Sequence, residues 1–156
     1  MNHSNPLVAV VCGSKSDEDY VKQTISVLEE LDIPYISEVV SAHRDPERLH
    51  SWIQDAENMG VKVFIAGAGG SAALPGVVSS WTLLPVIGVP YPSSDVKGID
   101  SIYSIVQMPP GVPVACVALG SWGARNSAYF AASILGLNNP QILEKYNAHR
   151  ESLRSR

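Results

Sequence analysis

The chain has 156 residues, of which 46% are hydrophobic and 17% are charged. This length suits one domain with a substantial core, and the composition excludes an intrinsically disordered protein. With 11 basic and 15 acidic side chains, the formal net charge is −4. The sequence therefore lacks the basic charge typical of proteins that bind duplex nucleic acid, and we expect no such partner.

Cysteine content and hydropathy indicate in which cellular compartment the protein is expected. Cys12 and Cys116 are too few for a disulfide framework, and both lie in apolar runs, so we expect buried thiols in a reducing environment. Neither a CxxC pair nor a Cys/His cluster predicts a metal site. Residues 1–6 are polar and expected to be flexible, without the apolar core of a signal peptide. Because no apolar run reaches the ~18 residues of a membrane span, we expect a cytoplasmic protein without membrane contact.

Four short runs rich in valine and isoleucine predict strands that are buried on both faces, as in parallel sheets, and one more run predicts a further strand. In chain order they cover residues 7–12, 34–40, 61–66, 84–89 and 112–119. The second run is more polar than the others, so we expect it nearer an edge of the sheet.

Apolar residues at helical spacing lie between these runs and predict amphipathic helices. The three stripes are Val21, Ile25, Leu28 and Leu31; Leu49, Trp52, Ile53 and Ala56; and Ala124, Ala128, Ala131 and Leu135. We expect Trp52 in the core. The alternation of strand and helix predicts right-handed βαβ units and a single three-layer α/β domain over residues 1–156. Residues 139–156 are predicted to form a C-terminal helix that caps the domain or packs against a second subunit.

Ligands of an open parallel sheet bind at the carboxyl ends of its strands, so the loops that follow the strands are the first candidates for a site. The first such loop is GSKSD, residues 13–17. The hydroxyls of Ser14 and Ser16, with free N–H groups at the start of the next helix, predict a phosphate cradle. The alternative is a plain helix cap made by Ser16 or Asp17, and the two interpretations are compatible.

The loop after the second strand, SAHRDP at residues 41–46, places a histidine beside an arginine. Arg44 is suited to bidentate binding of a phosphate, and His43 to proton transfer near neutral pH. Pro46 predicts that a helix begins directly afterwards. The alternative is an ordinary surface pair, but a position at the same sheet edge as the serine-rich loop favours a functional role.

The loop after the third strand, GAGGSAALPG at residues 67–76, consists mainly of small residues. Such a run lets the backbone pass close to a ligand; the alternative is a tight turn between a strand and a helix. It matches neither GxGxxG with a downstream acidic residue nor GxxxxGK[ST]. The sequence therefore excludes a dinucleotide fingerprint and a nucleotide P-loop here.

Taken in order, these motifs resemble the PurE family of purine biosynthesis. The matching stretches are GSKSD at 13–17, SAHR at 41–44, GAGG and LPG within 67–76, LPVIGVP at 84–90 and GIDSIYSIVQMP at 98–109. The resemblance extends from Val8 to about Tyr146. It implies a flavodoxin-like fold, a homo-octamer with active sites shared between subunits, and no metal, biotin or nucleotide cofactor.

The resemblance also implies a reaction. Microbial members are mutases that convert N5-carboxyaminoimidazole ribonucleotide into 4-carboxy-5-aminoimidazole ribonucleotide by releasing and recapturing carbon dioxide, whereas other members carboxylate aminoimidazole ribonucleotide directly. His43 matches the general acid/base of the family. The expected substrate-binding residues are Ser14, Ser16, Asp17, Ser41, Arg44, Gly69, Gly70, Ser71, Ala73 and Leu74.

One position departs from the family pattern. Mutases of this family usually carry histidine where this chain has Ala73. Direct carboxylases also lack that histidine, but they usually carry lysine where this chain has Arg44. A mutase is therefore the main expectation. The alternatives are a direct carboxylase that uses free carbon dioxide, and a paralogue or altered variant that binds a ribonucleotide.

Overall fold

The computed structural model describes residues 5–154 and contains a five-stranded parallel sheet in the order β2-β1-β3-β4-β5. The strands are β1 (Val8–Cys12), β2 (Tyr35–Val39), β3 (Val63–Gly69), β4 (Val86–Tyr91) and β5 (Ala115–Cys116). The helices are α1 (Glu18–Glu30), α2 (Pro46–Asn58), α3 (Leu74–Trp81), α4 (Ile99–Val106), α5 (Gly120–Leu135) and α6 (Pro140–Arg154). A short 3₁₀ turn, Lys15–Asp17, precedes α1.

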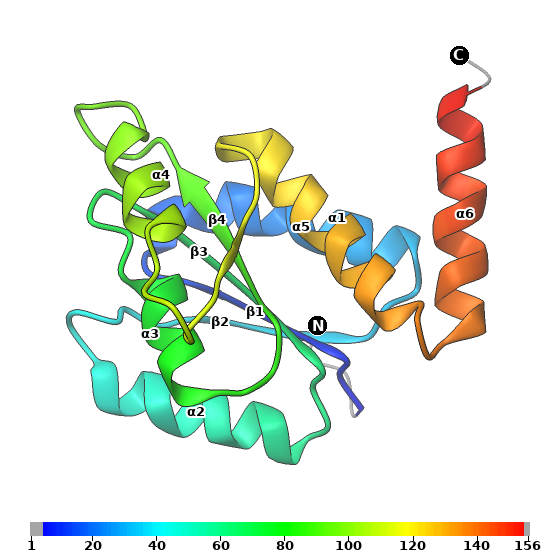
Figure 1. The fold of residues 1–156 in the computed structure, drawn as a ribbon, viewed down its shortest axis with the longest axis horizontal. Helices are drawn as coiled ribbons and strands as arrows, with labels where there is room; N and C mark the ends of the chain where they lie inside the picture. The colour runs from blue at the N-terminus through cyan, green and yellow to red at the C-terminus, as the bar shows by residue number, and fades with distance from the viewer. Residues whose placement is uncertain (1–4, 155–156) are drawn as a thin grey trace.

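Helices cover both faces of the sheet, which confirms the expected three-layer, flavodoxin-like α/β fold (Figure 1). The side chains of β1 show why its run is apolar throughout. Val8 and Val10 belong to the core under α1 and α5, whereas Ala9 and Val11 belong to the core under α2 and α3. Successive residues of a strand point to opposite faces, so a strand covered on both sides contains no solvent-facing position.

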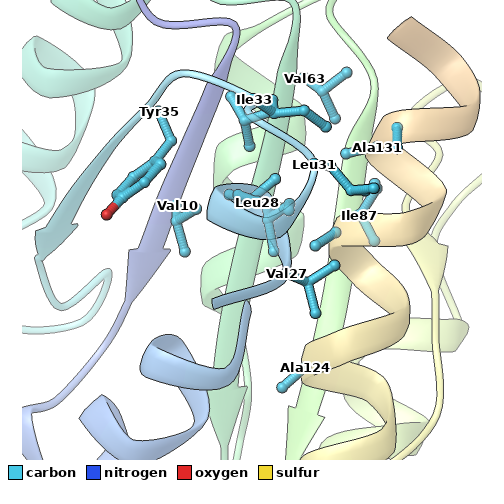
Figure 2. Close-up of a cluster of buried hydrophobic side chains, with 14 of the residues drawn as sticks. Val10, Val27, Leu28, Leu31, Ile33, Tyr35, Val63, Ile87, Ala124 and Ala131 are labelled. Atoms are coloured by element: carbon cyan, nitrogen blue, oxygen red, sulfur yellow. The ribbon is translucent and has the colours of Figure 1, made fainter. Parts of the chain in front are cut away.

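The core between the sheet and helices α1 and α5 depends on the small residues of α5. Ala124, Ala128 and Ala131 are fully buried, as the alanine stripe predicts, and they let α5 lie close to α1 (Figure 2). Leu28 of α1 fills the space beside them. Thr24 Oγ1 donates a hydrogen bond of 2.8 Å to the Ala124 carbonyl oxygen, and this bond joins the two helices.

Helix α6 lies at one end of the molecule, beside α1 and α5 (Figure 1). Ile142 is its buried anchor. Tyr146 stacks on Tyr129 of α5, and His149 Nδ1 lies 3.2 Å from Glu30 Oε1 at the end of α1. Leu143 and Leu153 remain about half exposed, so part of the apolar surface of α6 stays uncovered in this chain.

The bounds of β3 and β5 depart most from the predicted runs. β3 continues through Gly67 to Gly69 because these residues pair with Val89, Pro90 and Tyr91 of β4. The predicted glycine-rich loop is therefore partly strand. β5, which pairs with β4, consists of two residues rather than the predicted run 112–119, because Pro113 has no N–H to extend the ladder.

Burial departs from the prediction along the whole run 112–119, where every residue is exposed or half-buried, and at Trp52. Cys116 is half-buried rather than buried, because it lies on the edge strand β5. Trp52 packs against Phe64 with ring centroids 6.0 Å apart, yet remains partly exposed at the margin of the core.

The two ends of the chain add little to these observations. Residues 1–4 of the segment expected to be flexible lie outside the described residues, and Pro6 is buried. None of the helices between residues 5 and 154 combines the length and the apolar character needed to cross a membrane.

Candidate active site

A pocket of about 360 Å³ lies at the carboxyl ends of β1, β2 and β3. Every residue predicted for the site lines it except Gly70. Gly70 has a φ of +60° and turns the backbone where β3 ends, a left-handed conformation that glycine adopts at little cost. The three loops are remote in sequence and meet because parallel strands end at the same edge of the sheet.

The first loop is organised by Ser14 rather than by Ser16 or Asp17. Ser14 Oγ accepts hydrogen bonds from the Ser16 amide at 3.3 Å and from the Ser16 hydroxyl at 2.9 Å. Ser14 thus caps the 3₁₀ turn, a side-chain cap that was not predicted, whereas Asp17 takes one of the two predicted cap positions. Asp17 occupies the cap position of α1 but makes no side-chain cap bond.

Asp17 is the acidic residue of the pocket and lies at its floor. It is only 4% exposed, and this burial raises the pKa of its carboxyl group, an effect partly offset by a hydrogen bond from the Ser16 hydroxyl. A buried carboxylate is costly unless it has polar partners. A ligand with hydroxyl groups, such as a ribose, would supply donors to it.

The second loop carries the cation of the pocket. Arg44 Nη2 donates to the Gly13 carbonyl oxygen at 3.0 Å, and Arg44 Nε donates to Ser41 Oγ at 3.2 Å. The guanidinium therefore spans the gap between the loops after β1 and β2. Asp45 accepts a bond of 3.3 Å from the Arg48 amide, and Pro46 begins α2 as predicted, so the loop ends in a rigid helix.

His43 lies next to Arg44 on the same loop and lines the same pocket. Its imidazole is exposed within the subunit and makes no hydrogen bond to the described residues. Both ring nitrogens are therefore available to a ligand, which is what a general acid/base requires.

The third loop places the start of α3 at the pocket. Ala73 is the N-cap residue of α3 and provides no side-chain acceptor, and Ala73 and Leu74 both line the pocket. N–H groups in the first turn of a helix have no partner within the helix. An anionic group placed here would accept hydrogen bonds from the first-turn N–H groups other than that of Pro75, which has none.

Comparison with known proteins identifies the family. A family model described as AIR carboxylase matches residues 7–156. The chain belongs to the AIR carboxylase family. This finding confirms the resemblance that the loop motifs indicate.

The alignments of this AIR carboxylase family member with its relatives cover nearly the whole chain. It is 49% identical over 150 residues to the N5-carboxyaminoimidazole ribonucleotide mutase of Saccharolobus solfataricus, covering 96% of this chain and 94% of that protein. It is 51% identical to the enzyme of the same name from Pseudomonas aeruginosa, covering 92% and 88%. The crystal structure of Treponema denticola PurE superimposes with a TM-score of 0.88 at 32% identity, covering 96% and 92%.

One pocket residue of this family member lies outside the three predicted loops. Ser93 follows β4 and lines the pocket together with the three predicted loops. The rule that ligands bind beyond the carboxyl ends of strands applies equally to β4. Its application to the fourth strand would have identified the loop that contains Ser93.

The structure holds no metal-type cluster in the part of the chain that it describes: no three His, Cys, Asp or Glu side chains come together within residues 5–154. A larger hollow of about 1080 Å³ lies at the opposite edge of the sheet, where Leu84 and Pro85 precede β4. Its lining includes Trp81, Leu83 and Phe130 but no histidine or arginine. Its charged side chains are Glu57 and Lys62, so it differs from the smaller pocket in having no histidine–arginine pair.

Proposed function

We propose that this protein is an N5-carboxyaminoimidazole ribonucleotide mutase, which produces 4-carboxy-5-aminoimidazole ribonucleotide in purine biosynthesis. The observation that carries the proposal is that His43 and Arg44 line one pocket together with the small-residue start of α3. The names of the relatives, which are similar over more than nine tenths of this chain, support the same activity.

Arg44 and the loop of Ser14 form the phosphate site in this proposal. Arg44 is already oriented by the Gly13 carbonyl and the Ser41 hydroxyl, so little side-chain entropy is lost when a phosphate binds. Guanidinium groups pair with phosphate through charge-assisted hydrogen bonds. The buried Asp17 carboxylate then accepts hydrogen bonds from the ribose hydroxyls.

His43 moves the proton in this mechanism. It gives a proton to the exocyclic nitrogen as the bond from that nitrogen to the carboxyl carbon breaks and carbon dioxide leaves. The ring carbon then attacks carbon dioxide, and His43 takes the proton that this carbon loses. Carbon dioxide must be held away from water between the two steps. The small residues Gly69, Ala72 and Ala73 provide an apolar wall for it.

The decisive experiment compares two substrates. The purified protein is supplied either with N5-carboxyaminoimidazole ribonucleotide or with aminoimidazole ribonucleotide plus bicarbonate, and formation of the common product is followed. We expect turnover of the first substrate without added bicarbonate. A protein that binds ribonucleotide but turns over neither substrate would contradict the proposal and favour a binding protein.

Direct carboxylation of aminoimidazole ribonucleotide is the second candidate, and Ala73 is the observation that favours it. The small side chain leaves this wall of the pocket without an imidazole, so carbon dioxide from solution has easier access. Turnover that requires added bicarbonate would support this candidate.

We also propose that the protein acts as a cytoplasmic homo-octamer. Exposed apolar residues on α4, Ile99, Tyr103 and Val106, and Trp122 at the start of α5 support an extensive subunit interface. Helix α6, with its half-exposed leucines, is a candidate intersubunit element. Sedimentation of the active protein tests this, and a stable active monomer would contradict it.

A further inference from the structure

The polar groups of the pocket are distributed unevenly. The loops after β1 and β2 contribute every charged or titratable side chain of the lining, namely Asp17, His43 and Arg44, and three hydroxyls besides. The loops after β3 and β4 contribute small or apolar residues and two side-chain hydroxyls, those of Ser71 and Ser93. A carboxyl group held in this second half therefore has two side-chain donors beside the backbone N–H groups at the start of α3.

Ser93 is placed against the backbone of the third loop. A Cβ atom on Gly69 would collide with Ser93 Oγ, and it would stand 3.0 Å from the Tyr91 carbonyl oxygen. The hydroxyl of Ser93 thus occupies the side of Gly69 where other residues carry their side chain. Glycine at this position is required for the close approach of β4 and its loop to the pocket wall.

The Ser93 hydroxyl is also free to bind a ligand. It makes no hydrogen bond to any residue within 5–154, and the side chain is exposed at the pocket. The neighbouring Ser94 differs, because its hydroxyl is buried away from the pocket lining and makes no hydrogen bond to the described residues. The two serines are therefore a matched pair that differ in access to the ligand.

We propose that Ser93 is a specificity-determining residue that donates a hydrogen bond to the carboxylate of the carboxylated ribonucleotide. This inference rests on the proposed function, because it takes the carboxyl group to lie over Gly69 and the start of α3. A hydroxyl beside this wall distinguishes a carboxylated from an uncarboxylated imidazole, since the latter offers no anionic acceptor there.

The test measures the binding of two ligands by titration calorimetry: 4-carboxy-5-aminoimidazole ribonucleotide and aminoimidazole ribonucleotide. Ser93→Ala should weaken binding of the carboxylated ligand about tenfold or more, the loss expected for one hydrogen bond to a charged group. Binding of the uncarboxylated ligand should stay the same. Ser93→Thr keeps the hydroxyl and should retain most of the affinity of the parent protein.

The Ser94→Ala variant is the control and should bind both ligands like the parent protein. Equal weakening of both ligands by Ser93→Ala, or no weakening of either, would overturn the role of Ser93. Failure of the proposed function gives a different result: the parent protein would bind both ribonucleotides yet leave N5-carboxyaminoimidazole ribonucleotide unconverted. The binding comparison would then still decide the role of Ser93.

Discussion

The side chain of Tyr91 lies across Gly67, and its hydroxyl stands where a Cβ atom on Gly67 would be. The tyrosine ring also stacks on Tyr20 of α1, with centroids 4.6 Å apart and planes 15° from parallel. One aromatic side chain thus connects the end of β4, the end of β3 and the first turns of α1. Because Asp17 directly precedes α1, this packing supports the floor of the candidate active site.

Substitution of Gly67 tests this relationship. In Gly67→Ala the added methyl group would meet the ring of Tyr91, which is 1% exposed and has no room to move aside. We expect the free energy of unfolding to fall by about 1–3 kcal/mol, the usual cost of an overpacked core. Chemical denaturation measures it. Gly13→Ala is the control, because no atom lies within 4 Å of a Cβ there; equal stability of both variants would contradict the packing.

His43 is the proposed proton carrier. His43→Asn should keep the fold and the affinity for the ribonucleotide but lower the turnover rate by about 10²–10⁴-fold, the usual contribution of general acid/base catalysis. Circular dichroism and ligand titration check the first two expectations, and a steady-state assay checks the third. A near-normal rate would remove His43 from the mechanism.

Arg44 is the proposed phosphate ligand. Arg44→Ala removes the guanidinium that donates to Gly13 and Ser41 and also leaves the phosphate without its cation. We expect the dissociation constant of the ribonucleotide to rise at least tenfold, as for loss of about 1.5–3 kcal/mol of charged hydrogen bonding. The corresponding nucleoside, which has no phosphate, should lose much less affinity. Parallel losses for nucleotide and nucleoside would argue against a phosphate contact.

Asp17 gives a prediction about stability and pH. Burial raises its folded-state pKa above the ordinary value of 3.8. The folded protein therefore binds this proton more tightly than the unfolded chain does. The protonated carboxyl group stabilises the fold below pH 3.8, and this stabilisation is lost as the pH rises through the folded-state pKa. Asp17→Asn should accordingly melt at a higher temperature than the ligand-free parent near neutral pH, and this advantage should disappear in acid.

Thermal melts across this pH range measure the difference, and ligand titration shows what the carboxylate contributes to binding. Asp17→Asn should bind the ribonucleotide more weakly, because an amide is a poorer acceptor for ribose hydroxyls than a carboxylate. A variant that is less stable than the parent at neutral pH would show that the carboxylate stabilises the fold.

Ala73 tests which reaction the pocket performs. A mutase must retain carbon dioxide, and Ala73→His would place a hydrogen-bonding ring at the pocket wall and exclude water. In a mutase we therefore expect higher turnover and less incorporation of labelled bicarbonate into the product. In a direct carboxylase the ring would enter space that the substrate uses, and the rate would stay the same or fall. Rapid label uptake by the parent protein, unchanged in the variant, would favour direct carboxylation.

The sequence by itself determined the layers of the fold and three of the four pocket loops. Strands covered on both faces require continuous apolar runs, and helices that pack on them require a stripe at helical spacing. Both patterns are local and can be read directly. Once five parallel strands are predicted, the loops after them must share one edge, so His43, Arg44 and Ser14 were expected together.

Tertiary structure decided the features that depend on pairing between distant segments. The register between β3 and β4 turns Gly67 to Gly69 into strand, and of the last predicted run only Ala115 and Cys116 pair with β4. The contact between Ser93 and Gly69 arises because Gly69 pairs with Tyr91 where β3 and β4 end, and no periodicity in the sequence encodes it. Local spacing predicts which elements form, whereas register and long-range packing determine where each element ends and which side chains meet there.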